Sequence, residues 1–251
     1  MRRSRITGAL GKIDPKAIAY WRNGYSVLFP GVDEYIDCGN GTANFEYTQA
    51  FSTAYWFKTS SVANSLPLSK LSSVLTRGWQ NNLDTAGRLL FGLYHVGGGT
   101  NALAMRTVNG FNNGVWRHAV ATYDGSNTPA GIKIYINAVS ETLTTTQNNL
   151  DDTIVNDAIC SIGSFNGASY FYNGNMDEIL IYNKKLSSAE VTALYNGGVP
   201  IDPAGLSTWS DALHYWRMGD KDIFNILKDN KGSADGTMTN MLAGDIVQDT
   251  P

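Results

Sequence analysis

The stretch FYNGNMDEILIYNKKLS, residues 171–187, shows the pattern on which the rest of the chain is built. Asn173 and Gly174 are turn residues, because both tolerate the positive φ angles that tight turns require. Residues 176–182 follow this turn, and their length and mostly apolar composition are typical of a β-strand. A turn followed by a short strand is the unit that recurs through the sequence.

A short helix is predicted directly after this stretch. Ser187 is followed three residues later by Glu190, which is the spacing of an N-terminal capping box. The apolar residues behind the box lie on one side of the helix; they are Val191, Leu194 and Tyr195. Asn196 and Gly197 end the helix, because both favour the left-handed conformation found at helix C-termini.

Strand patterns recur on the N-terminal side of residues 171–187. Ile132, Ile134 and Ile136 alternate with polar residues, a period of two that predicts a half-buried strand. Residues 51–57 are bulky on both faces, as in a strand inside a two-sheet sandwich. Further strands are predicted at 26–29, 34–38, 73–76, 88–95, 102–107, 116–123, 159–163 and 169–173.

The composition agrees with an all-β protein. The 26 glycines, 13 tyrosines and 6 tryptophans suit many short strands joined by tight turns. Hydrophobic residues make up 43% and charged residues only 16%, which predicts a folded chain with a large core. A length of 251 residues is within the range of one all-β domain with extensions.

The charge is unevenly distributed. The net charge of −3 argues against a protein that grips nucleic acid, because phosphate binding requires a basic face. Residues 1–25 nevertheless form a basic arm of six cations against Asp14 alone; they are Arg2, Arg3, Arg5, Lys12, Lys16 and Arg22. No secretory signal or membrane-spanning pattern is found, so we expect synthesis in a cytosol and no membrane insertion.

Three blocks in order, 26–36, 116–125 and 161–163 with 171–187, resemble the laminin-G-like, concanavalin-A-like jelly-roll domains. Such domains are found in lectins, pentraxin-like proteins and many phage virion proteins. The resemblance covers about residues 26–198. It implies a two-sheet antiparallel jelly-roll sandwich with one short helix.

The chain departs from this family at its ends. Family members usually open with a segment that residues 1–25 lack, whereas residues 213–220 and 227–238 are similar to it. We therefore expect a circularly permuted sandwich. Its parts are a basic arm at 1–25, the sandwich at 26–199, and an extension at 200–251 that supplies a strand to its own sheet or to a neighbouring copy.

Enzyme chemistry is not expected. Asp177 and Glu178 are neighbours in a predicted strand, so their side chains should point to opposite faces and should not act together on one sugar. His95, His118 and His214 are scattered, which argues against zinc, and His118 is expected to pack inside the sandwich.

Two kinds of ligand site are weighed. The resemblance implies a calcium site formed by Asp33 and Asp177, which occupy the matching places. The alternative is that Asp33 ends a turn and Asp177 caps a strand edge. Aromatic residues beside Asn and Gly turns suit a glycan platform, although core packing explains them equally well; they are Trp79, Tyr94, Phe111 and Tyr170.

The leading hypothesis is a non-enzymatic structural or adhesion protein of a phage-like virion, such as a head decoration, tail or fibre-associated protein. It would be anchored through its terminal extensions to other virion proteins or to copies of itself. The alternative is a carbohydrate-binding, lectin-like module, whose ligand would be a host-surface glycan. Cys38 and Cys160 are expected to be free, partly buried thiols.

Overall fold

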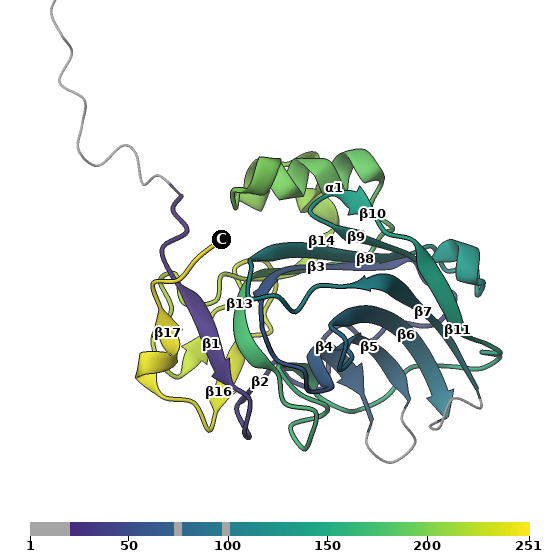
Figure 1. Ribbon diagram of the computed structural model, residues 1–251, viewed down its shortest axis with the longest axis horizontal. Coiled ribbons are helices and arrows are strands. Elements are labelled where there is room, and N and C mark those ends of the chain that lie inside the picture. Colours follow the sequence, from purple (N-terminus) through teal and green to yellow (C-terminus); the bar gives the residue numbers. More distant parts are fainter. Residues whose placement is uncertain (1–20, 73–76, 97–100) are drawn as a thin grey trace, which may run out of the picture.

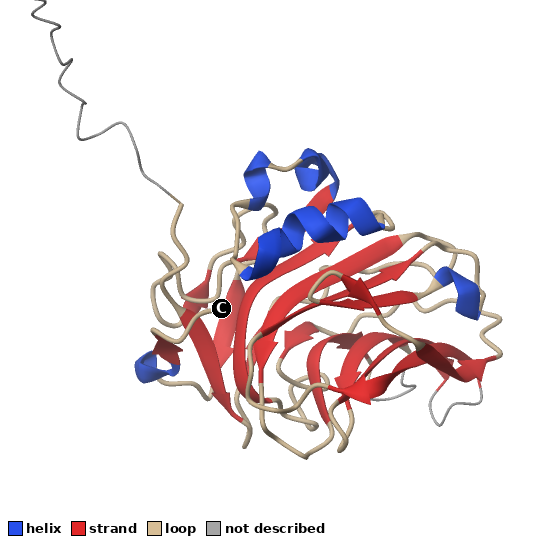
Figure 2. Ribbon diagram, turned by 45° about the horizontal axis from the view of Figure 1, so that its top comes forward, coloured by secondary structure: helices blue, strands red, loops and turns tan. Residues whose placement is uncertain are grey.

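The computed structural model describes residues 21–72, 77–96 and 101–251. Two antiparallel sheets face each other, and a short helix covers the outer side of one of them (Figure 1). Figure 2 shows how strongly strands dominate the fold. The predicted all-β, two-sheet sandwich with one short α-helix is therefore confirmed.

The first sheet has the order β10-β9-β8-β3-β13-β1-β17, and β14 pairs with a further part of β13. Its strands are β1 (Ser26–Pro30), β3 (Phe51–Lys58), β8 (Arg117–Tyr123), β9 (Lys133–Ile136), β10 (Val139–Ser140), β13 (Asn173–Tyr182), β14 (Ala212–Trp216) and β17 (Ile246–Val247).

The second sheet has the order β11-β7-β6-β5-β4-β12-β2-β16-β15. Its strands are β2 (Tyr35–Asp37), β4 (Ser65–Leu71), β5 (Gly78–Leu83), β6 (Arg88–Val96), β7 (Asn101–Gly110), β11 (Leu143–Asn148), β12 (Cys160–Ile162), β15 (Ile226–Leu227) and β16 (Gly236–Thr239).

The helix α1 (Ser188–Tyr195) begins at the predicted capping box: Ser187 accepts from the Glu190 backbone N–H, and the Glu190 side chain returns to Ser187. Val191 and Leu194 face a small apolar cluster on the outer side of the first sheet. Single turns of 3₁₀-helix fill several connections; they are η2 (Pro129–Gly131), η3 (Asn196–Gly198), η4 (Pro203–Gly205), η5 (Ser207–Asp211) and η6 (Ala243–Asp245).

The main core lies between the two sheets. Phe51, Tyr55 and Phe57 of β3 alternate inward and meet Trp79 and Phe91 of the second sheet. Their neighbours on β3 face the helix side instead, because successive side chains of a strand point to opposite faces. Burying aromatic residues of this size supplies a large share of the hydrophobic stabilisation.

The C-terminal extension is built into the sandwich of its own chain. β14 and β17 join the first sheet, and β15 and β16 join the second. Trp216 and Met218 of the extension are fully buried in the main core. Near the chain end, Asp249 accepts from Lys58 Nζ at 2.7 Å and from Trp116 Nε1 at 3.0 Å. In this structure the strand that the sequence predicts from this extension pairs with β13 of its own chain.

Several predicted strands differ from the structure. The segment at 73–76 lies outside the described residues, whereas β4, β5 and β11 were not predicted, because their polar residues interrupt the apolar pattern. Residues 169–172 form a loop with one isolated bridge, from Ser169 to Phe165, and β13 begins only at Asn173. Tyr170 has a φ of 52°, which breaks the extended conformation there.

Both cysteines are free and buried; Cys38 directly follows β2, and Cys160 begins β12, which pairs with β2. The Cys38 amide donates to the Cys160 carbonyl at 2.9 Å. Among the described residues, no helix is both long and apolar enough to cross a bilayer.

Candidate functional site

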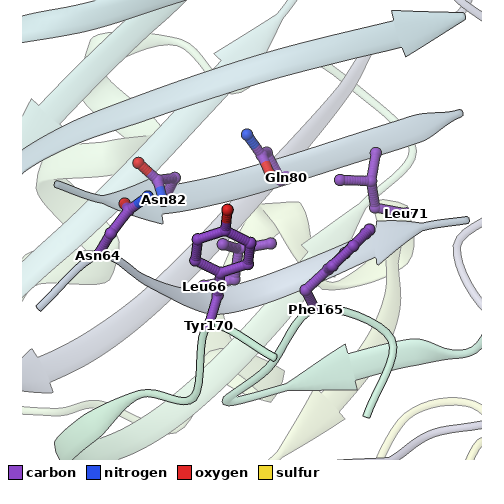
Figure 3. Close-up of a pocket in the computed structure, with 7 residues that line it drawn as sticks. All are labelled: Asn64, Leu66, Leu71, Gln80, Asn82, Phe165 and Tyr170. Carbon is purple, nitrogen blue, oxygen red and sulfur yellow. Dashed lines mark hydrogen bonds between the residues drawn. The ribbon is translucent and has the colours of Figure 1, made fainter. Parts of the chain in front are cut away.

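A groove of about 220 Å³ lies on the outer face of the second sheet, over β4 and β5. On β5, Trp79 faces the core and Asn81 bonds Thr53 of the opposite sheet at 3.2 Å. Gln80 and Asn82 therefore point outward, into the groove. Figure 3 shows the side chains of Gln80 and Asn82 on one strand, with those of Tyr170 and Phe165 extending toward them from a loop.

The loop 163–172 forms an aromatic wall. Tyr170 is 48% exposed and Phe165 is partly buried, and their ring centroids are 6.2 Å apart in an edge-on arrangement. The backbone holds this wall in place, because the Leu66 amide donates to the Tyr170 carbonyl at 2.9 Å. Leu66 and Leu71 of β4 form an apolar floor beside the rings.

The opposite wall consists of carboxamides that are fixed by hydrogen bonds. Asn82 Nδ2 donates to Asn64 Oδ1 at 2.7 Å and to the Ser65 carbonyl at 3.1 Å. Gln80 Nε2 donates to the Tyr94 hydroxyl at 3.0 Å. Burial raises the pKa of Tyr94 to about 12, so this hydroxyl stays protonated at neutral pH.

The described residues that line the groove include no acidic or basic side chain. An apolar ring face opposite fixed amides suits a ligand that has one apolar face and several hydrogen-bonding groups. The lining offers no pair of carboxylates of the kind that glycoside hydrolysis requires.

The four aromatic residues predicted as a glycan platform are not gathered in one place. Tyr170 lines the groove, and Tyr94 lies behind its amide wall. Trp79 follows the core-packing alternative instead: it is 1% exposed, and its Nε1 donates to the Ala43 carbonyl inside the core. Phe111 packs against the main core.

Sequence reasoning missed the carboxamides of the groove and Phe165. The amides belong to β5 and to the turn before β4, and neither strand was recognised. The alternation of Trp79, Gln80, Asn81 and Asn82 is the signal that could have placed two amides on one outer face.

The two predicted calcium ligands have separate partners. Asp33 is exposed and accepts from Asn240 Nδ2 at 3.0 Å, whereas Asp177 is fully buried and accepts from Asn23 Nδ2 at 2.8 Å. Within 21–72, 77–96 and 101–251, no group of three or more His, Cys, Asp or Glu residues could hold a metal ion. Calcium at Asp33 and Asp177 therefore stays a prediction.

Asp177 and Glu178 do not point to opposite faces as predicted, because β13 carries one extra residue here relative to β3. Glu178 has a φ of 48°, so the strict alternation of an extended strand is lost. Both carboxyl groups are buried near the carboxylate of Asp220. Glu178 accepts from the Tyr215 hydroxyl and lies 3.7 Å from Arg217 Nε.

Asp177, Glu178 and Asp220 form a buried polar cluster beside the first sheet, and burial changes the pKa values of the first two. Burial raises the pKa of Glu178 to about 8, and it also raises the pKa of Asp177. The segment 21–25 closes over the cluster: Asp220 accepts from the Gly24 amide at 3.0 Å, and Trp21 stacks on Arg217. The cluster thus joins the start of the described chain to the extension.

Arg22 is the one cation of the predicted basic arm within the described part of the chain. Its side chain is exposed, and its carbonyl accepts from Arg217 Nη2. The other five cations of the arm lie outside the described residues; they are Arg2, Arg3, Arg5, Lys12 and Lys16.

The three histidines have unrelated surroundings, as expected. His95 Nδ1 contacts the Thr153 carbonyl at 2.7 Å, and His214 contacts Asp229 at 2.7 Å. His118 is buried, as predicted, although it packs beneath the helix rather than between the sheets, against Trp56 and Tyr195. Burial lowers its pKa to about 3.

Residues 30–192 match the model of the concanavalin A-like lectin/glucanases superfamily. The chain belongs to this superfamily. The matched segment includes β3 to β13, and it therefore contains every residue that lines the groove. No protein with a curated description matches the sequence.

Two solved structures share the fold. A putative carbohydrate-binding protein from Bacteroides ovatus is 16% identical, with a TM-score of 0.61 over 87% of this chain. The match covers 59% of that protein, so this chain spans less than two thirds of its length. A heptameric SAP-like pentraxin from Limulus polyphemus is 14% identical, with a TM-score of 0.52 over 86% of this chain and 95% of the pentraxin.

Proposed function

We propose that this chain is a carbohydrate-binding module that holds a glycan in the groove beside Tyr170 and does not cleave it. The half-exposed Tyr170 ring, which faces fixed carboxamides across an apolar floor, is the observation that carries the proposal. Sugars have an apolar ring face and a rim of hydroxyls, so this combination matches both parts of the ligand. The likeness to the putative carbohydrate-binding protein from Bacteroides ovatus supports it at the level of the fold.

Screening on a glycan array, followed by calorimetric titration of each hit, tests this proposal. Stacking that covers about 50 Å² of the Tyr170 ring contributes about 1.3 kcal/mol, at about 25 cal/mol per Å². We therefore expect Tyr170→Ala to weaken binding by about tenfold. Phe224→Ala is the matched control, because Phe224 is a 40% exposed aromatic residue that does not line the groove.

Two results would contradict the proposal. One is that the wild-type protein retains no glycan at millimolar concentration. The other is that Tyr170→Ala binds the hit as tightly as Phe224→Ala does, which would place the ligand elsewhere on the molecule.

Assembly into a phage-like virion is the second candidate function. That the protein is located in such a particle stays a prediction. An exposed apolar patch favours a protein contact, because such patches commonly mark interaction sites. In this patch Ile223 is 81% exposed, and Ile226 is 42% exposed beside it. Density-gradient separation of the particles, followed by immunodetection of the chain, tests this function; recovery only in the soluble fraction would count against it.

A further inference from the structure

The groove is lined by uncharged side chains, and this restricts the chemistry of its ligand. None of the described lining residues is acidic or basic. An anionic sugar would therefore lose part of its hydration without gaining a cation in return.

Two cations of the second sheet contact groups outside the groove lining. Lys70 of β4 donates from Nζ to the Asn40 carbonyl at 2.6 Å and to the Ala158 carbonyl at 2.7 Å, and its side chain is buried. Arg106 of β7 lies 3.5 Å from Asp84, which also binds Arg88 at 2.8 Å. Neither Lys70 nor Arg106 is among the described residues that line the groove.

The hydrogen bonds of the amide wall define what it offers to a ligand. Both Nδ2 protons of Asn82 are used, by Asn64 Oδ1 and by the Ser65 carbonyl, so Asn82 presents its Oδ1 as an acceptor. Asn64 accepts through Oδ1, so it presents its Nδ2 as a donor. A sugar hydroxyl both donates and accepts and satisfies this pair, whereas a carboxylate only accepts and faces Asn82 Oδ1 without a proton to share.

The third amide, that of Gln80, is held by the Tyr94 hydroxyl, and the Tyr94 ring has room only because residue 92 is glycine. A Cβ at Gly92 would lie 2.6 Å from the Tyr94 hydroxyl oxygen and 2.7 Å from Tyr94 Cε2. Glycine at this position thus lets the Tyr94 ring lie across β6 and accept from Gln80 Nε2. The amides are fixed before a ligand arrives, which reduces the entropic cost of binding.

We propose that the groove takes one neutral hexopyranose unit of a glycan and rejects a uronic or sialic acid at the same place. The apolar face of the sugar ring lies on Tyr170, and one sugar hydroxyl bridges Asn64 and Asn82. The volume of about 220 Å³ is below the roughly 300–1,000 Å³ of pockets for drug-sized ligands, so neighbouring units extend into solvent. This inference rests on the proposed glycan-binding function.

Length-matched oligosaccharide pairs that differ at C6 test the inference: glucan and glucuronan, mannan and mannuronan, galactan and galacturonan. Titration at pH 7 and low salt should show binding of the neutral member of at least one pair, with its uronate at least tenfold weaker. A uronate that binds as tightly as its neutral partner overturns this inference and leaves the glycan-binding function intact. Binding of none of the six, together with an empty glycan array, overturns both.

The variant Asn64→Asp tests whether the glycan binds at the amide wall of the groove. It is isosteric, it still accepts from Asn82, and it replaces the free donor with a negative oxygen at an exposed position. We expect neutral-glycan binding to fall by about tenfold, with an unchanged thermal midpoint. Asn113→Asp adds the same charge at an exposed turn away from the groove and should bind like wild type. Equal affinity of both variants overturns the assignment.

Discussion

Replacing Trp216 with alanine tests whether the C-terminal extension is an integral part of the sandwich. Trp216 is fully buried in the main core, and its Nε1 donates to the Ala234 carbonyl at 2.8 Å. Its ring also stacks on His214, with centroids 5.3 Å apart. The substitution removes a large apolar side chain and leaves the Ala234 carbonyl without this donor.

A buried Trp→Ala change lowers the free energy of unfolding by about 3–5 kcal/mol, because the surrounding structure fills the cavity only in part. In a chain of this size, 1 kcal/mol corresponds to about 2–4 °C in the thermal midpoint. The expected drop for Trp216→Ala is therefore on the order of 6–20 °C.

Thermal and urea unfolding followed by far-UV circular dichroism measure this drop without relying on tryptophan fluorescence. Trp209→Ala is the matched control, because Trp209 is also in the extension but is only partly buried, with Lys231 Nζ 4.6 Å from its ring centroid. Its midpoint should fall by a much smaller amount. The wild-type midpoint should also be independent of protein concentration, because the extension pairs with its own chain.

A midpoint of Trp216→Ala within about 2 °C of wild type would refute this reasoning, because it would mean that the extension contributes little to the core. A wild-type midpoint that rises with protein concentration would refute the cis arrangement instead. It would indicate a strand exchanged between copies.

Two further predictions follow from buried titratable groups. The pKa of Glu178 is about 8 in the fold, above its ordinary value, so the folded state binds more protons and its stability falls as pH rises from about 4.5 to 8. Glu178→Gln removes this titration, and the loss of thermal midpoint between pH 5 and pH 8 should become smaller than in wild type; an identical loss would contradict the assignment. Burial raises the pKa of both Cys38 and Cys160, so neither thiol should react with a thiol-specific disulfide reagent in native protein, and both should react in urea. Rapid labelling of the native chain would show that the strands around them open.

The prediction of the fold succeeded where local pattern and burial coincide. The turn at Asn173 and Gly174 precedes an apolar strand, and Ser187 with Glu190 forms the predicted capping box. It failed for β5, where outward amides alternate with inward residues and dilute the apolar signal. It also failed at Glu178, because an extra residue in β13 redirects a carboxyl group that strict alternation would place on the other face.

The sequence by itself determined the all-β class, the short capped helix and the strand character of the extension, because these depend on local periodicity and on turn and capping chemistry. Only the tertiary structure decided which aromatic residues are exposed: Trp79 and Tyr170 both lie beside polar residues in sequence, yet one fills the core and the other faces solvent. The groove likewise depends on long-range pairing, which brings the loop of Tyr170 against β4 through the bond to Leu66. Such contacts between distant residues are set by how the whole sandwich packs, and no local pattern encodes them.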